Sequence, residues 1–141
     1  MADERLLVRV HVSALDDANV VQAGLEAWLG DVEISRETSA SHHGPTMITF
    51  FSEISRRAEL RRAVEGLGPE VRSTLVREVE ERLDDAGGLH YRLALDALVA
   101  GECRLSPPGS SRSVKVQHRV AVYPGQTAVD RLREALSPPA P

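Results

Sequence analysis

Lysine, cysteine and aromatic residues are scarce in this chain, and long apolar runs are missing. Only Lys115 is a lysine and only Cys103 is a cysteine, whereas arginine occurs sixteen times in 141 residues. A lone cysteine cannot form a disulfide within the chain. No apolar run is long enough to span a bilayer or to form the core of a signal peptide. These absences favour a cytoplasmic protein without a membrane partner.

The composition that remains is that of a globular domain. Apolar residues make up 42% and charged residues 27% of the chain, which is ordinary for a folded protein of this length. We expect one domain over residues 1–136, followed by a flexible C-terminal tail over residues 137–141. The net charge of -4 argues against binding polyanions through the whole surface, but it leaves room for a local basic patch.

Strand periodicity is clearest near both ends of the chain. In RLLVRVHVSA the apolar residues Leu6, Val8, Val10 and Val12 alternate with polar ones, which predicts one buried and one exposed strand face. VKVQHRVAVY, residues 114–123, repeats the pattern, with His118 on its apolar face. LHYRL and TMITFF also indicate strands, and HHGP indicates a tight turn in a hairpin.

Helical spacing of apolar residues fills the segments between these strands. Asp16 is the expected N-cap of a helix that ends at Gly30, and Ser55 is the expected N-cap of the next. Pro69 should begin a third helix, in which Glu78 and Arg82 can pair at i,i+4. Thr127 should start a terminal helix. Together these patterns predict an α+β fold, a mostly antiparallel sheet with helices packed mainly on one face.

Strand alternation places four cations on the sheet face that the helices leave uncovered. These are Arg9, Arg92, Lys115 and Arg119. The segment from Gly87 to Tyr123 holds five basic and two acidic residues, whereas nine acidic residues lie between Glu53 and Asp85. Such segregation suits a surface that faces phosphates. Cations on exposed strand faces also prevent aggregation, which is the simpler alternative.

A second basic cluster lies in SRRAELRRA, at the beginning of the predicted second helix. Its members are Arg56, Arg57, Arg61 and Arg62. Arginines close to a helix N-terminus, which itself favours anions, are candidate phosphate contacts. A solvated helix face is the alternative interpretation. Because aromatic residues make up only 4% of the chain, we expect any RNA contact to read phosphate and shape more than base sequence.

Signals for catalysis, a metal or a cofactor are missing from the sequence. His42 and His43 are adjacent, but Cys103 and the other histidines, His11, His90 and His118, are scattered without the spacing of a metal site. No glycine-rich phosphate loop follows a strand, and no nucleophile elbow occurs. We therefore predict a protein that is not an enzyme and has no metal or cofactor.

Four segments, in the same order, resemble a small archaeal RNA-binding family of predicted exosome subunits. They are SHHGPTMITF, SRRAELRRAVEGL, ERLDDAGGLHYRLALDALVAGECRL and VKVQHRVAVYPG, and the likeness covers about residues 6 to 125. The resemblance implies a fold like that of the ribosomal protein that contacts 5S RNA. The family's motif positions match His43, Gly44 and Pro45, then Arg92 and Leu93, and finally Gly101.

One departure from this family concerns the residues after Leu93. The family continues with Asp-Lys-Gln, whereas this chain has Ala94, Leu95 and Asp96. If the lysine contacts RNA in relatives, this chain lacks that contact.

The combined prediction is a non-catalytic protein that binds structured RNA, with the archaeal exosome or other RNA-processing proteins as implied partners. The alternative is a protein interaction module, a homodimer or complex subunit that docks through exposed strand edges or acidic helices without direct RNA contact.

Overall fold

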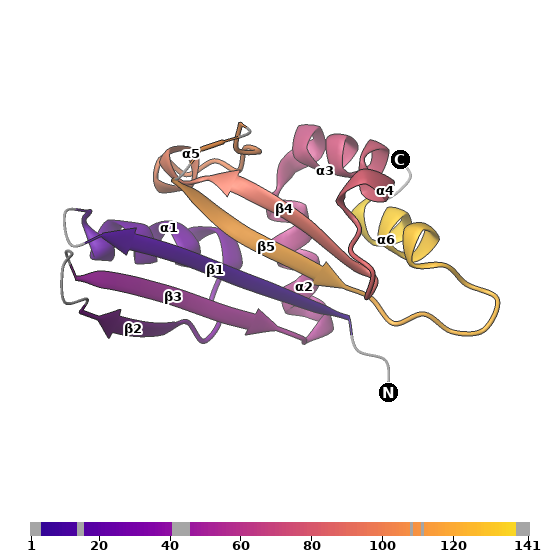
Figure 1. The fold of residues 1–141 in the computed structure, drawn as a ribbon, viewed down its shortest axis with the longest axis horizontal. Coiled ribbons are helices and arrows are strands. Elements are labelled where there is room, and N and C mark those ends of the chain that lie inside the picture. The colour runs from indigo at the N-terminus through magenta and orange to yellow at the C-terminus, as the bar shows by residue number, and fades with distance from the viewer. Residues whose placement is uncertain (1–3, 14–15, 41–45, 108, 111, 138–141) are drawn as a thin grey trace.

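A computed structural model describes residues 4–13, 16–40, 46–107, 109–110 and 112–137, which form a five-stranded antiparallel sheet and six helices (Figure 1). The order of strands across the sheet is β2-β3-β1-β5-β4. The strands are β1 (Arg5–Ser13), β2 (Ser35–Ser39), β3 (Met47–Ile54), β4 (Gly88–Ala94) and β5 (Ser113–Arg119). The helices are α1 (Ala18–Leu29), α2 (Arg57–Gly66), α3 (Gly68–Arg77), α4 (Val79–Arg82), α5 (Leu95–Val99) and α6 (Ala128–Leu136). The predicted α+β class is confirmed.

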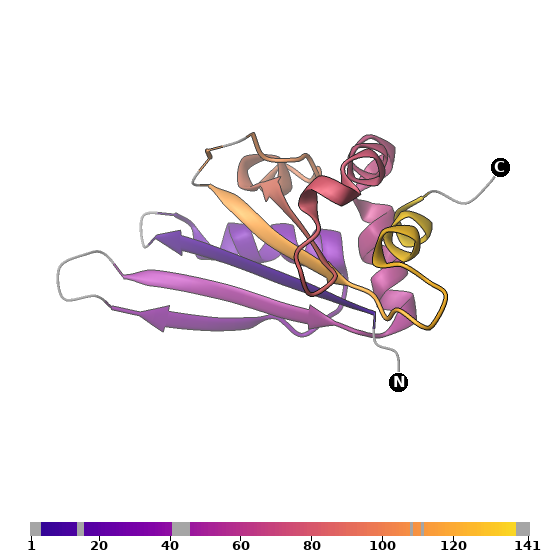
Figure 2. The same cartoon turned by 45° about the vertical axis from the view of Figure 1, so that its right-hand side comes forward.

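The hydrophobic core lies between one face of the sheet and the helices. In β1, Leu6, Val8, Val10 and Val12 are each at most 2% exposed, as their alternation predicts. Figures 1 and 2 show α1 and α2 on the same side of the strands, with the opposite face of the sheet uncovered. Strand β2 pairs with β3 as the predicted hairpin. The turn expected at His42 to Pro45 lies outside the described residues.

Helix α1 begins one residue later than its sequence suggests. Its N-cap is Asp17, whose side chain accepts hydrogen bonds from the backbone N–H groups of Asn19 and Val20. The expected cap, Asp16, instead pairs with Arg112, whose Nη1 lies 2.7 Å from Oδ1 of Asp16. At the other end of the helix, Trp28 donates a 2.8 Å hydrogen bond from Nε1 to the carbonyl of Ala63, which joins α1 to α2.

Helix α2 also departs from its predicted cap. Its N-cap residue is Arg56 rather than Ser55, and the Arg56 side chain makes no capping hydrogen bond. Helix α3 has Pro69 at its start, as expected. Among the described residues, no helix is both long and apolar enough to cross a membrane.

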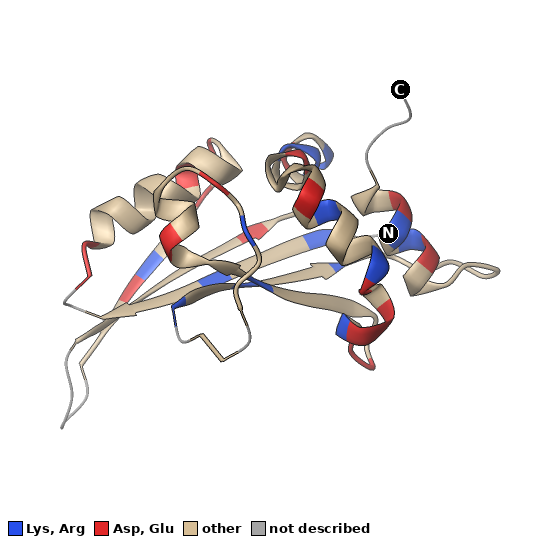
Figure 3. Ribbon diagram, turned by 90° about the horizontal axis from the view of Figure 1, so that it is seen from above, with Lys and Arg blue, Asp and Glu red and all other residues tan. Residues whose placement is uncertain are grey.

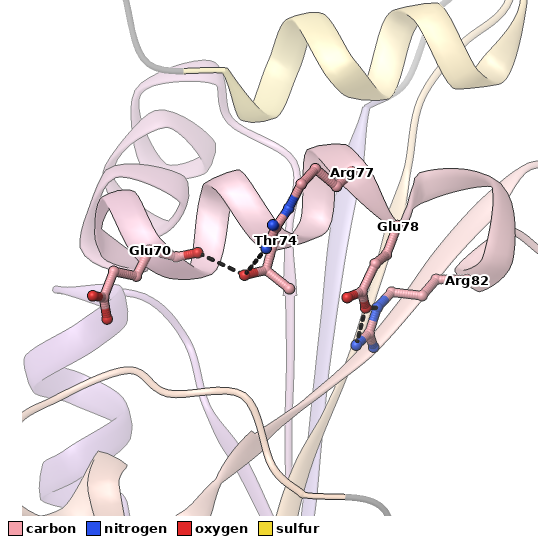
Figure 4. Close-up of polar contacts among 5 residues, drawn as sticks. All are labelled: Glu70, Thr74, Arg77, Glu78 and Arg82. Carbon is pink, nitrogen blue, oxygen red and sulfur yellow. Dashed lines mark hydrogen bonds and ion pairs between the residues drawn. The ribbon is translucent and has the colours of Figure 1, made fainter.

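Polar side chains on α3 and α4 form local contacts, one of them an ion pair (Figure 4). Arg82 donates from Nε and Nη2 to the Glu78 carboxylate at 3.0 and 2.8 Å, which confirms the predicted i,i+4 pair. Thr74 donates to the carbonyl of Glu70 at 3.0 Å and accepts from Arg77 at 3.2 Å. The helical layer therefore carries both charge signs side by side (Figure 3), rather than being mainly acidic.

Strand β5 ends at Arg119, four residues earlier than its alternation predicts. Val122 is 47% and Tyr123 50% exposed, so the expected inward position of Val122 is wrong. Arg119 is opposite both Arg5, the first residue of β1, and Gly88, the first residue of β4. Beyond Arg119 neither β1 nor β4 continues among the described residues, and the chain leads into α6, where Thr127 is the N-cap as predicted.

Candidate nucleic-acid interface

The uncovered face of the sheet brings three cations into one line across three neighbouring strands. Lys115 on β5 is directly opposite Arg9 on β1 and Arg92 on β4. Residues opposite each other in antiparallel strands point to the same face. All three side chains are exposed. We call Arg9, Lys115 and Arg92 the cation row.

The cation row lacks carboxylate partners in the part of the chain that the structure describes. Among the described residues, none of the three cations forms an ion pair. The Arg9 guanidinium lies over the ring of Phe51, 5.3 Å from its centroid, and Arg92 reaches the Ser113 hydroxyl at 3.5 Å. Like charges directly opposite one another in a sheet destabilise it. A bound anion would relieve that repulsion.

Arg119 shares this face but lies four residues further along β5. Its guanidinium faces the side-chain amide of Gln117. With the amide oxygen turned toward Arg119, which is the orientation that satisfies both groups, that oxygen accepts from Nε at 2.9 Å and from Nη2 at 3.1 Å. Its cross-strand neighbour Arg5 pairs with Glu53 at 3.4 Å. Arg119 therefore extends the cationic surface to the end of the sheet at which β1 begins.

Acidic residues occupy other parts of the same face. Glu53 on β3 is opposite Leu7, and Glu37 on β2 is opposite Thr49, so both lie on the half of the sheet away from β4 and β5. Asp84 lies before β4 and pairs with His90. The backbone N–H of Gly88, followed by His90, holds the pKa of Asp84 down at about 2. The face thus has a cationic half, made by β1, β5 and β4.

The second predicted cluster is not on the sheet face, and its four arginines do not lie in one place. Arg57 and Arg61 line a groove between α2 and α6. Arg62 lies against Gly30, where a Cβ atom would come within 2.6 Å of its Nε. Arg56 is exposed at the N-cap of α2. The helix therefore divides these residues among three environments.

At residues 94–96, where the chain departs from the family pattern, no side chain takes the place of the family's lysine. Leu95 is only 2% exposed and belongs to the core, and Asp96 lies 3.6 Å from the Arg112 guanidinium. The cationic half of the sheet is therefore built without a contribution from residues 94–96. Within the described ranges, no group of three His, Cys, Asp or Glu residues could hold a metal ion.

Several polar and aromatic residues near these sites were not predicted from the sequence to be part of them. Phe51 lies opposite Arg9 on the outer face of the sheet, with the Arg9 guanidinium over its ring. Glu4 lies 2.9 Å from the fully buried ring of His118, and Tyr123 and Arg131 line the groove that contains Arg57. The alternation of side chains along β3 could have predicted that Phe51 lies on the outer face. Nothing local in the sequence indicates the groove.

Comparison with known proteins identifies relatives of the whole domain. A model of a family described as RNA binding matches residues 5–120. A DUF54 protein from Methanothermobacter thermautotrophicus has a similar structure, with a TM-score of 0.76 at 20% identity, covering 97% of this chain and 100% of that chain. A DUF54 protein from Archaeoglobus fulgidus gives 0.78 at 21% identity, covering 94% and 99%.

A more distant structural neighbour is a UPF0201 protein from Methanococcus jannaschii. Its TM-score is 0.68 at 7% identity, and the match covers 94% of this chain and 99% of that chain. At such identities these structures establish the shared fold alone. Among curated proteins, none matches the sequence.

Proposed function

This chain belongs to the RNA-binding family, and we propose from that membership that it binds structured RNA through the uncovered face of its sheet, without catalysing a reaction. The contacts are ionic, made by the cation row together with Arg119. The observation that carries the proposal is the line Arg9, Lys115 and Arg92, which crosses three strands and has no carboxylate partner among the described residues.

The geometry suits a backbone of phosphates better than a set of bases. Neighbouring strands are about 4.8 Å apart, so the cation row spans about 10 Å before its long side chains extend. Proteins recognise A-form RNA helices mainly through shape and through phosphate and 2′-hydroxyl contacts. The row offers such contacts, whereas Phe51, the aromatic ring beside it, already lies under Arg9. We therefore infer recognition of duplex or otherwise structured RNA with little dependence on sequence.

The salt dependence of RNA binding tests this proposal. Each phosphate contact steepens the slope of log K against log[salt] by about 0.9 on duplex nucleic acid, because binding releases condensed counterions. Replacing Lys115 and Arg119 together with Ala should therefore flatten the slope by about two units.

The matched control is Arg77→Ala, which removes an exposed cation from α3 in the helical layer. This variant should keep the slope of the unmodified protein. If the double variant on the sheet face also keeps that slope, the interface lies elsewhere.

The likeness to predicted exosome subunits supports a finer proposal about partners. We propose that the bound RNA is handled by the archaeal RNA-degrading machinery and that this fold, like that of the ribosomal protein that contacts 5S RNA, serves to hold structured RNA. Affinity capture of the protein from archaeal cells, with and without ribonuclease treatment, tests this. Recovery of exosome subunits only without ribonuclease would indicate an RNA-bridged association.

One observation favours a protein interaction module as the second candidate function. Strand β2 is at the edge of the sheet, and all five of its residues are exposed. An edge strand of this kind can pair with a strand of another chain. Sedimentation without RNA separates the two functions, because an adaptor or homodimer should assemble in the absence of nucleic acid.

A further inference from the structure

A groove of about 890 Å³ lies between α2 and α6, apart from the cation row. Figure 2 shows the two helices side by side, close to the loop that leads into α6. Arg57 and Arg61 line the groove from α2, Arg131 from α6 and Tyr123 from the loop. Its size falls within the range of sites for small ligands, about 300–1,000 Å³.

The cations of this groove are only partly neutralised. Arg57 and Arg61 are one helical turn apart, and neither forms an ion pair with another described residue. Arg131 donates from Nε to the carbonyl of Ala121 at 3.3 Å, and its Nη1 lies 3.8 Å from Glu134.

Two other charged residues at the groove are engaged elsewhere. Arg72, only 8% exposed, donates to the carbonyls of Leu136 and Ser137 at 2.8 Å each, which fixes the end of α6. Glu4 is hydrogen-bonded to His118. Arg57 and Arg61 are therefore the two groove cations with guanidinium groups left for a ligand. Glu4 and Glu65 are the groove carboxylates that form no ion pair with an arginine among the described residues, and the charge of Arg57 acts on Glu4.

Tyr123 supplies an aromatic surface at the same place. Its side chain lines the groove while the residue remains 50% exposed. Its backbone is fixed, because the N–H of Tyr123 donates to the Gln126 side chain at 3.2 Å and the carbonyl accepts from the Gln126 N–H at 2.9 Å. An exposed ring of this kind can stack on any base. The groove thus combines phosphate-binding arginines with a stacking surface.

We propose that the α2–α6 groove binds an unpaired nucleotide at the end of an RNA helix. Arg57 and Arg61 contact its phosphate, and the ring of Tyr123 stacks on its base. Helix α2 supports the anion, because its N-cap residue Arg56 makes no side-chain capping hydrogen bond, and both Ser55, just before the helix, and Arg57, its first residue, line the groove. The inference rests on the proposed function only in that the sheet face holds the paired part of the same RNA.

The test compares two RNAs of the same helix length. One is a blunt duplex of about 16 base pairs, which is long enough to cover a domain of this size. The other carries an extension of about three unpaired nucleotides at its 3′ end or at its 5′ end. We expect an extension at one of these ends to tighten binding by about tenfold, the effect of stacking one base.

Three variants assign that gain to the groove. Tyr123→Leu and the double variant Arg57→Ala/Arg61→Ala should each remove the gain and leave the affinity for the blunt duplex unchanged. Arg56→Ala is the matched control, because Arg56 is exposed on the same helix but does not line the groove, and it should keep the gain.

The outcomes separate this inference from the proposed function. No gain from either extension, or a gain that survives both groove variants, overturns the inference. Displacement of the extended RNA by an acidic peptide of about ten glutamates as readily as by a single-stranded trinucleotide also overturns it. Failure of the unmodified protein to bind the blunt duplex overturns the sheet-face function instead, and leaves the groove to be judged by its binding of the unpaired extension.

Discussion

Replacing Glu4 with Gln is expected to destabilise the fold by about 1 kcal/mol at neutral pH. Glu4 precedes β1 and accepts a hydrogen bond at 2.9 Å from Nε2 of His118, whose ring is 0% exposed on the inner face of β5. Nδ1 of His118 has no partner among the described residues. This pattern is that of a neutral ring with its proton on Nε2, because a second proton would leave a buried donor unsatisfied.

The expected loss of stability follows from the replacement of a hydrogen bond to a charged carboxylate by one to a neutral amide. A hydrogen bond to a charged acceptor contributes about 1.5–3 kcal/mol, and a neutral one about 0.5–1.5 kcal/mol. The glutamine side chain of the variant could still accept through its amide oxygen, so the variant loses the difference. Because the Glu4 side chain is 31% exposed, we take the lower part of that range. A loss of about 1 kcal/mol corresponds to a fall of about 3–5 °C in Tm for a domain of this size.

The effect should disappear in acid. The hydrogen bond from His118 lowers the pKa of Glu4 below its ordinary value of 4.5; burial opposes this shift, and the charges of Arg131 and Arg57 add to it. A carboxyl group whose pKa is lower in the folded state stabilises the fold above its unfolded pKa. That contribution is lost as the pH falls through the folded value. The difference between the two proteins should be constant above about pH 5.5 and shrink at lower pH.

Urea denaturation measures this difference, followed by the fluorescence of Trp28, the one tryptophan of the chain, which is 6% exposed. Glu53→Gln is the control, because Glu53 and Arg5 are both 48% exposed and their pair should contribute less than about 1 kcal/mol. A loss above about 3 kcal/mol for the Glu4 variant would indicate a charged His118 left without its partner. That result, or a difference unchanged at pH 3, would refute the reasoning.

Two further predictions concern buried groups. Burial raises the pKa of Cys103 to about 11, so its thiol should react with iodoacetamide at pH 8 much more slowly in the folded protein than in denaturant; equal rates would contradict this. Trp28→Phe removes the 2.8 Å hydrogen bond to Ala63 between α1 and α2 and should cost about 1–2 kcal/mol. Far-ultraviolet circular dichroism during urea denaturation measures that loss, and an unchanged midpoint would mean that the bond contributes nothing.

Strand parity could be predicted from the sequence because it is a local property. Side chains alternate between the two faces of a strand, so the valines of β1 and β5 determine where Arg9 and Lys115 point. The end of β5 could not be predicted in the same way. Val120 and Val122 continue the alternation, but β1 and β4 both begin opposite Arg119, and a strand ends where its neighbours no longer pair with it.

Two predictions differ from the structure, the cap of α1 and the grouping of the arginines on α2. In both cases the deciding contacts involve residues far away in the chain. Asp16 and Asp17 are both suitable caps for α1, and Arg112, 96 residues away in the chain, pairs with Asp16. The arginines of α2 look like one group in sequence, yet a helix directs successive residues to different sides. Arg57 and Arg61 consequently face α6, whereas Arg62 lies against Gly30 at the end of α1.

The sequence by itself determined the α+β class, the apolar faces of the strands and the outward direction of Arg9, Lys115 and Arg92, because these depend on periodicity over a few residues. Only the tertiary structure decided that Lys115 lies between the two arginines in one row, and that Tyr123 and Arg57 line the same groove. Strand order, register and helix packing bring together residues far apart in the chain. Those long-range pairings depend on the packing of the whole core.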